Sequence, residues 1–243
     1  MVTNWQLLTG CDPVTENSSS GWIGSPHAID VTVIHLVGEE VRFADISIAL
    51  YDGNQPSWFE HKNRRLPGYD LAFIKLEKRP DFRSLSLDYL EIEQDEKIVP
   101  GNDCFVLGFP FGDSLGYPMC IWKRATIASE SLFDFKGEPR FLVDTATRPG
   151  MSGSPVFKAK RGVKLRTPLQ AAGAATALEQ LLDIEILPSH DPQGELIMEF
   201  CGVYQGVFTD RIERDFQLGY VIEAKALTEL IRDPQPGTIK KLS

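Results

Sequence analysis

The sequence lacks the features that mark nucleic-acid-binding and membrane proteins. Its 25 lysines and arginines are outnumbered by 34 acidic residues, and no basic run is longer than two residues, so little in it suits a phosphate backbone or an anionic lipid surface. Its longest apolar runs, such as residues 104–111, fall far short of the ~20 residues that a membrane-spanning helix needs. We therefore expect no nucleic-acid partner and no membrane partner.

Cysteine pairs and metal-ligand spacings are also missing. No CxxC occurs, and no histidine stands near a cysteine at metal-ligand spacing, so we expect no metal and no cofactor. The start of the chain has neither a charged leader nor an apolar signal core, which predicts a cytoplasmic protein with buried thiols in place of disulfides, unless the natural start lies upstream. The four cysteines are Cys11, Cys104, Cys120 and Cys201.

Short apolar segments bounded by Gly, Pro, Asn and Asp make up most of the chain. Their β-branched and aromatic residues predict strands, and many short strands favour an all-β barrel or sandwich. Two helices are expected, at 169–182 and at 222–231, the second ending before Pro234. The expected strands are 29–37, 46–51, 71–76, 103–107, 141–143, 156–157, 201–208 and 219–222.

An acidic stretch at residues 91–97, followed by a Pro-Gly-Asn turn, is the best candidate linker. It divides the chain into an N-terminal domain of residues 1–95 and a C-terminal domain of residues 96–243. Residues 158–200 are first basic and then helical and acidic, which is typical of an insertion between two strands.

The stretch RPGMSGSPVF, residues 148–157, places Ser152 in a turn with a glycine on either side. A serine hydroxyl attacks a carbonyl group only when a base takes its proton and N–H donors stabilise the oxyanion that forms. The glycines allow a tight turn that exposes the hydroxyl and aims the N–H groups of Gly150 and Ser152 at one point. Taken alone, an ordinary turn rich in Gly, Ser and Pro is the simpler interpretation.

Three other segments change that interpretation. They are GYDLAFIKL at 68–76, VLGFPFG at 106–112 and FLVDTA at 141–146. With the serine turn, and in this order, they resemble the trypsin-like serine peptidases of chymotrypsin fold, particularly the bacterial members. The resemblance implies two antiparallel β-barrels with a C-terminal helix, and peptide-bond hydrolysis through an acyl-enzyme.

The resemblance also implies roles for individual residues. Ser152 matches the nucleophile, Asp70 the carboxylate that orients the base, and Gly150 with Ser152 the oxyanion hole. The segments 202–206 and 218–222 look like the strands that flank the specificity pocket. The pocket floor carries no acidic residue, so a small or apolar substrate side chain is expected. The implied pocket residues are Ala146, Thr147, Tyr204 and Gly206.

The base histidine is replaced in this sequence. In the family it stands upstream of the aspartate, commonly in a T-N-x-H turn, and residues 2–6, VTNWQ, match that turn with Gln6 in its place. A carboxamide cannot accept the serine proton and return it to the leaving amine, and loss of one triad member lowers kcat by up to ~10⁶ in a serine protease. We therefore expect a serine-endopeptidase homologue that is inactive or strongly impaired.

The strands that precede this turn in the family are missing from the sequence. The first barrel is therefore expected to be incomplete at its N-terminus. Our hypothesis is that the natural start lies upstream of Met1 or that the gene has decayed.

Two alternative functions stay open at this stage. One is a non-catalytic pseudoprotease module that binds a peptide or protein in the old cleft. The other is an active peptidase in which a different base, such as His27 or His61, or the substrate itself takes the place of the histidine. A peptide or protein partner is common to all three interpretations, and the sequence does not indicate an oligomeric state.

Overall fold

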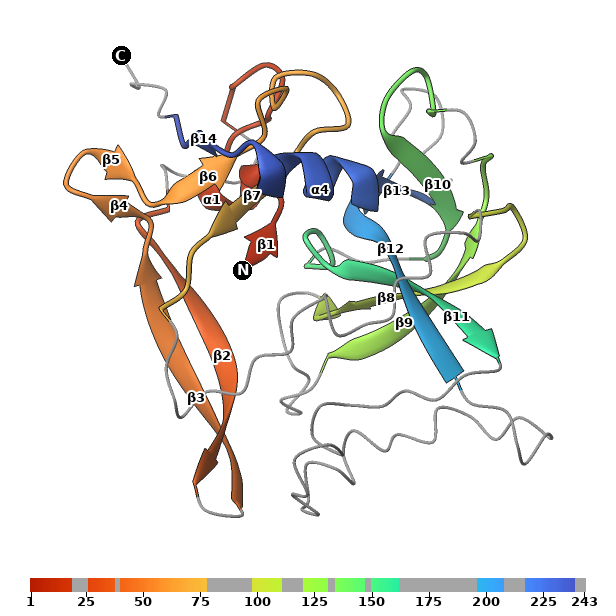
Figure 1. Ribbon diagram of the computed structural model, residues 1–243, viewed down its shortest axis with the longest axis horizontal. Coiled ribbons are helices and arrows are strands. Elements are labelled where there is room, and N and C mark those ends of the chain that lie inside the picture. The colour runs from red at the N-terminus through yellow and green to blue at the C-terminus, as the bar shows by residue number, and fades with distance from the viewer. Residues whose placement is uncertain are drawn as a thin grey trace.

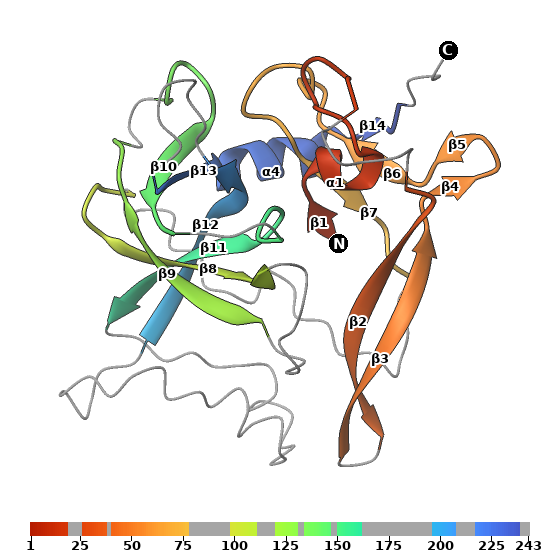
Figure 2. The same cartoon turned by 180° about the vertical axis from the view of Figure 1, so that it is seen from behind.

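The computed structural model of the chain describes residues 1–18, 26–37, 40–77, 98–110, 120–130, 134–146, 150–161, 196–207 and 217–238. Strands dominate the described residues, and the two helices among them are short (Figures 1 and 2). The helix expected at 169–182 and the linker expected at 91–97 lie outside the described residues. No helix in the described ranges is long and apolar enough to cross a membrane.

The C-terminal half forms a closed antiparallel barrel, as the sequence predicts (Figure 1). Alternate residues point inward, as in β8, where Cys104, Val106 and Gly108 are buried. The strands follow one another around the barrel in the order β10-β13-β12-β11-β8-β9. Their bounds are β8 (Asp103–Gly108), β9 (Ile121–Ile127), β10 (Arg140–Asp144), β11 (Pro155–Arg161), β12 (Leu196–Val207) and β13 (Leu218–Glu223).

The N-terminal half is more open. Its four-stranded sheet runs β1-β7-β6-β14, and within the described residues it does not close into a barrel. Two hairpin ribbons, β2–β3 and β4–β5, complete this half, and the β2–β3 ribbon extends away from the rest of the molecule in both views (Figures 1 and 2). The bounds are β1 (Val2–Thr3), β2 (Ala28–Val37), β3 (Glu40–Ala49), β4 (Tyr51–Asp52), β5 (Gln55–Pro56), β6 (Trp58–Glu60), β7 (Ala72–Ile74) and β14 (Gln235–Pro236).

The C-terminal helix joins the two halves. Helix α4 (Ala224–Arg232) continues directly from β13 and leads to β14, which pairs with β6 of the N-terminal sheet (Figure 1). The apolar face of α4, which includes Leu227 and Leu230, packs in one cluster with Leu71 of the N-terminal half. Strand β14 therefore belongs to the first sheet, although it lies within the predicted C-terminal domain of residues 96–243.

Several element boundaries differ from the sequence prediction. The expected helix at 222–231 begins at Ala224, because Ile222 pairs with Arg140 and with Val203 as part of β13. The strand β9 was not predicted, because charged side chains at its solvent-facing positions interrupt the apolar pattern of IWKRATI. The short helix α1 (Trp5–Thr9) was foreseen only as a turn, since five residues are too few for a helical period.

Candidate active site

Ser152 lies on a tight turn before β11. Gly150 and Gly153 have φ angles of 95° and 83°, a left-handed conformation that glycine adopts without strain. The N–H of Gly153 donates to the carbonyl oxygen of Tyr204 at 2.8 Å, which ties the turn to β12. Met151 is buried in the barrel core, whereas Ser152 is only half-buried. The hydrogen bond to Tyr204 and the buried side chain of Met151 thus hold the turn in place, and Ser152 stays partly exposed at the edge of the barrel.

Asp70 is placed just before β7, beneath the start of α1. Its Oδ1 accepts the backbone N–H of Gln6 at 3.0 Å, and its backbone carbonyl accepts Nδ2 of Asn4 at 2.9 Å. The side chain is buried, and no hydrogen bond of normal geometry reaches its other oxygen, Oδ2. The aspartate and the residue at the histidine position are therefore in direct contact, but through the backbone of Gln6.

Burial raises the pKa of Asp70 to about 7, because the charged carboxylate is separated from water. The backbone N–H groups of Gln6 and Trp5 and the side chain of Gln205 lower the pKa, and the charge of Asp12 raises it. These donors do not offset the loss of hydration. The carboxyl group is consequently divided between its neutral and charged forms near neutral pH.

The carboxamide of Gln6 is turned away from Asp70. Its Nε2 donates to the backbone carbonyl of Gln205 on β12 at 3.4 Å, a long hydrogen bond. The side chain of Gln6 therefore does not make the hydrogen bond to Oδ2 that an orienting carboxylate would accept from an imidazole. This leaves Oδ2 as a buried acceptor without a hydrogen-bond partner.

Residues 205 and 206 connect the three predicted positions. Gln205 accepts the hydrogen bond of Gln6, and a Cβ atom built on Gly206 would lie 3.8 Å from Oγ of Ser152. On the other side of the turn, a Cβ built on Gly153 would lie 2.5 Å from Oγ1 of Thr3 in β1. The structure thus brings Gln6, Asp70 and Ser152 to one place between the two halves of the chain.

Gln205 is also held by a cation that the sequence did not reveal. Nη1 of Arg140 donates to Oε1 of Gln205 at 3.2 Å, and the Arg140 guanidinium stacks 3.7 Å above the ring of Tyr220 and pairs with Glu138. Because the carboxamide oxygen of Gln205 faces Arg140, its NH₂ group is the part of this side chain that lowers the pKa of Asp70. Motif matching missed both residues, since their contacts join segments far apart in the chain.

The structure describes three of the four predicted pocket residues. Ala146 is half-buried just after β10, Gly206 faces Ser152, and Tyr204 is 1% exposed. Thr147 lies outside the described residues. The role of these residues in binding substrate stays a prediction.

The two histidines considered as substitute bases make contacts elsewhere. His61 is buried; its Nδ1 accepts the N–H of Asn63 at 3.0 Å, and its Nε2 lies 3.3 Å from a carboxylate oxygen of Glu229 on α4. Burial lowers the pKa of His61, an effect that Glu229 opposes. The ring of His27 packs edge-on against Tyr51, with the ring centres 6.0 Å apart. These contacts direct neither imidazole to Ser152.

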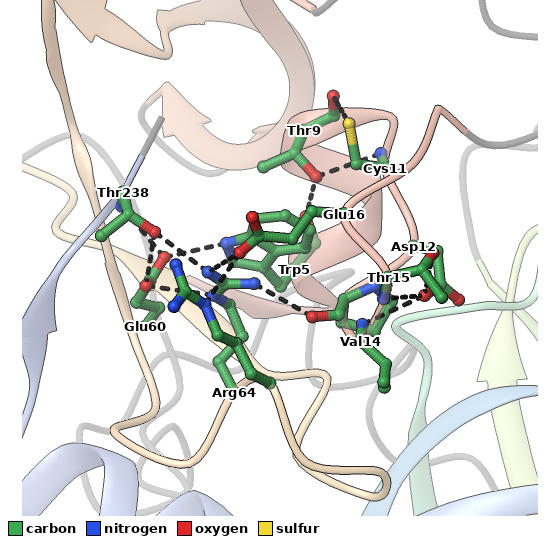
Figure 3. Close-up of polar contacts among 12 residues, drawn as sticks. Trp5, Thr9, Cys11, Asp12, Val14, Thr15, Glu16, Glu60, Arg64 and Thr238 are labelled. Carbon is green, nitrogen blue, oxygen red and sulfur yellow. Dashed lines mark hydrogen bonds and ion pairs between the residues drawn. The ribbon is translucent and has the colours of Figure 1, made fainter. Parts of the chain in front are cut away.

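A buried ionic cluster supports the helix that carries Gln6 (Figure 3). Nε1 of Trp5 donates to Glu60 at 2.9 Å, and the guanidinium of Arg64 lies 4.2 Å from the centre of a Trp5 ring. Arg64 binds Glu60 at 3.1 Å and Glu16 at 2.7 Å, and the hydroxyl of Thr238 donates to Glu60 at 2.9 Å. The cluster therefore connects α1 and β6 to the C-terminal tail.

Replacing Arg64 by methionine is expected to destabilise the fold by about 3–5 kcal/mol, because a buried carboxylate loses its partner. Arg64 is 3% exposed and Glu60 7%, so water cannot compensate the lost cation. Urea unfolding measures the change. Arg65→Met is the matched control, since Arg65 also binds Glu16 but is 69% exposed, and it should cost no more than about 1 kcal/mol. Equal losses in the two variants would contradict the assignment of Arg64 as the central cation.

The closed antiparallel barrel, with a glycine-bounded serine turn at its rim and an aspartate at the start of a facing strand, defines the chymotrypsin class of fold. The sequence profile of the trypsin-like peptidase domain matches residues 1–163, which include Gln6, Asp70 and Ser152. The chain belongs to the trypsin-like peptidase domain family, and the resemblance seen in the sequence is confirmed.

The comparison with curated protein sequences found no match. Among solved structures, the chain is similar to the serine endoprotease from Yersinia pestis, at 11% sequence identity and a TM-score of 0.40. The match covers 83% of this chain and 61% of that one, so this chain spans less than two thirds of the Yersinia protein.

Proposed function

We propose that the chain is a serine-peptidase homologue that binds a peptide or protein between its two halves and turns it over very slowly or not at all. The observation that supports this proposal is the place of Gln6, which contacts Asp70 through its backbone and Gln205 through its carboxamide. Gln6 occupies the position from which a base would serve Ser152. It cannot take a proton there.

In the proposed chemistry, the chain keeps oxyanion stabilisation and loses assisted proton transfer. Attack of Ser152 Oγ on a peptide carbonyl forms a C–O bond and an oxyanion, which the N–H groups of Gly150 and Ser152 would stabilise. The hydroxyl proton must leave at the same time, and the leaving amine must later receive one. Without a base at position 6 neither transfer is assisted. Binding and oxyanion stabilisation are the functions that remain.

A fluorophosphonate probe tests this proposal, because it reacts covalently with an activated serine. We expect the unaltered chain to label no faster than its Ser152→Ala variant, while Gln6→His labels at Ser152, as peptide mass spectrometry would show. Rapid labelling of the unaltered chain at Ser152 would mean that another group serves as base. Absence of labelling in a folded Gln6→His protein would overturn the assignment of the site.

A non-catalytic binding module is the second candidate function. It is favoured by the same glutamine, since a retained cleft without a base can still bind. The two proposals differ only in residual turnover. An active peptidase with a substitute base receives no support from His27 or His61, whose contacts lie elsewhere.

A further inference from the structure

Tyr204 on β12 is hydrogen-bonded through its backbone to the turn that carries Ser152. Its carbonyl oxygen accepts the N–H of Gly153, and its own N–H donates to the carbonyl of Ser154, both at 2.8 Å. These two hydrogen bonds fix the backbone of Tyr204 immediately beside the candidate nucleophile. A peptide that binds with its carbonyl at Ser152 would therefore lie next to Tyr204.

The ring of Tyr204 points into the barrel. Tyr204 is 1% exposed and belongs to the interior cluster together with Met151. Its neighbours point elsewhere: Val203 packs in the cluster that contains α4, and Gln205 faces Arg140. Alternation along β12 accounts for the opposite directions of Val203 and Tyr204, and Gln205 lies where the pairing of β12 with β13 shifts register. The side chains of Met151, on the turn, and of Tyr204, on the strand bonded to it, thus both pack in the barrel interior.

Gly219 on β13 provides the room for this ring. A Cβ built on Gly219 would lie 2.4 Å from Cε2 of Tyr204 and 2.6 Å from its hydroxyl oxygen, so the ring takes up the volume of the missing side chain. In β12, Gly206 likewise presents no side chain toward Ser152. The main chain of a substrate therefore has room beside Gly206, whereas the ring of Tyr204 occupies the volume next to Gly219.

We infer that Tyr204 restricts the substrate to peptides with a small residue, glycine or alanine, at the position whose carbonyl Ser152 attacks. The inference rests on the proposed function, because it assumes that a peptide binds against the serine turn. Tyr204 would thus limit the size of the substrate side chain from inside the barrel, whereas the sequence predicted only that it lines the pocket. A leucine or phenylalanine side chain at that position would collide with the tyrosine ring.

The test uses peptide p-nitroanilides that end in alanine or in phenylalanine, hydrolysed by Gln6→His and by Gln6→His/Tyr204→Ala. We expect Gln6→His to prefer alanine by about 100-fold or more in kcat/KM, and the Tyr204→Ala change to shift the ratio toward phenylalanine by a similar factor. Tyr204→Val opens a smaller space and keeps a residue suited to a strand. If the Tyr204→Ala variant does not fold, the same comparison is made with the Tyr204→Val variant.

Phe157→Ala in the same background is the matched control. Phe157 is a buried aromatic residue of the barrel wall that faces the α4 cluster, so its loss should lower stability without changing the preference. Equal use of both substrates by Gln6→His, or a ratio unchanged by folded Tyr204 variants, would overturn the inference alone. Failure of Gln6→His to hydrolyse either substrate would overturn the proposed function and the inference with it.

Discussion

Replacing Gln6 by histidine is expected to raise kcat for peptide hydrolysis by about 10⁴- to 10⁶-fold over the unaltered chain, the range by which triad members contribute in serine proteases. Two predicted site residues lie near this position: Asp70 accepts the backbone N–H of residue 6, and Ser152 lies against Gly206, which follows the Gln205 that Gln6 contacts. An imidazole at position 6 could donate one N–H to the unpaired Oδ2 of Asp70. Its other nitrogen would then be available to the serine.

The pH dependence of the variant distinguishes a working base from a general effect on the fold. Hydrolysis by Gln6→His should rise with pH through the pKa of the new imidazole, because only the neutral ring accepts a proton. The measurement is kcat/KM for an alanine p-nitroanilide as a function of pH.

Two controls belong to this experiment. Gln6→Asn keeps a carboxamide and should show no gain, and adding Ser152→Ala to Gln6→His should remove the gain. A gain that survives the loss of Ser152 would point to a different nucleophile and contradict the assignment.

The site residues that the sequence predicted lie on local patterns. Ser152 is recognisable because glycines surround it, and Asp70 because it opens a short apolar strand. Both features are set by neighbours in the chain, so they can be predicted without the fold. Five of the six strands of the C-terminal barrel also overlap predicted strands, as at 103–107 and 141–143, and only β9 was missed.

The rest of the site depends on contacts between distant segments. Gln205 meets Gln6 across 199 positions and Arg140 across 65 positions, and neither pairing leaves a periodic or spaced pattern in the sequence. The same holds for Tyr204. Its place beside the site was predicted, but the direction of its ring depends on Gly219 of the next strand. Side-chain direction and pKa arise from this packing and are therefore visible only in the structure.

Asp70→Asn is expected to stabilise the protein at about pH 8 and to have little pH-dependent effect at about pH 4. Burial raises the pKa of Asp70 in the folded protein to about 7, above the ordinary value of 3.8, so the folded protein holds the proton more tightly than the unfolded chain. Stability from this group is therefore complete below about pH 4 and is lost as pH rises through about 7. A difference of roughly three pKa units corresponds to about 4 kcal/mol.

Urea unfolding of the parent and the variant at both pH values measures this effect. At each pH, the free energy of unfolding of the parent is subtracted from that of the variant. The change in this difference between about pH 4 and about pH 8 contains no pH-independent cost of the amide, such as an unpaired Nδ2, and reports the titration of Asp70. The Gln6→His background provides a further control, because an imidazole that pairs with Oδ2 favours the charged carboxylate and should shrink the gain. If Asp70→Asn has the same effect at both pH values, Asp70 titrates alike in the folded and unfolded chains. The loss of hydration at Asp70 would then be fully offset by its hydrogen bonds to Gln6, Trp5 and Gln205.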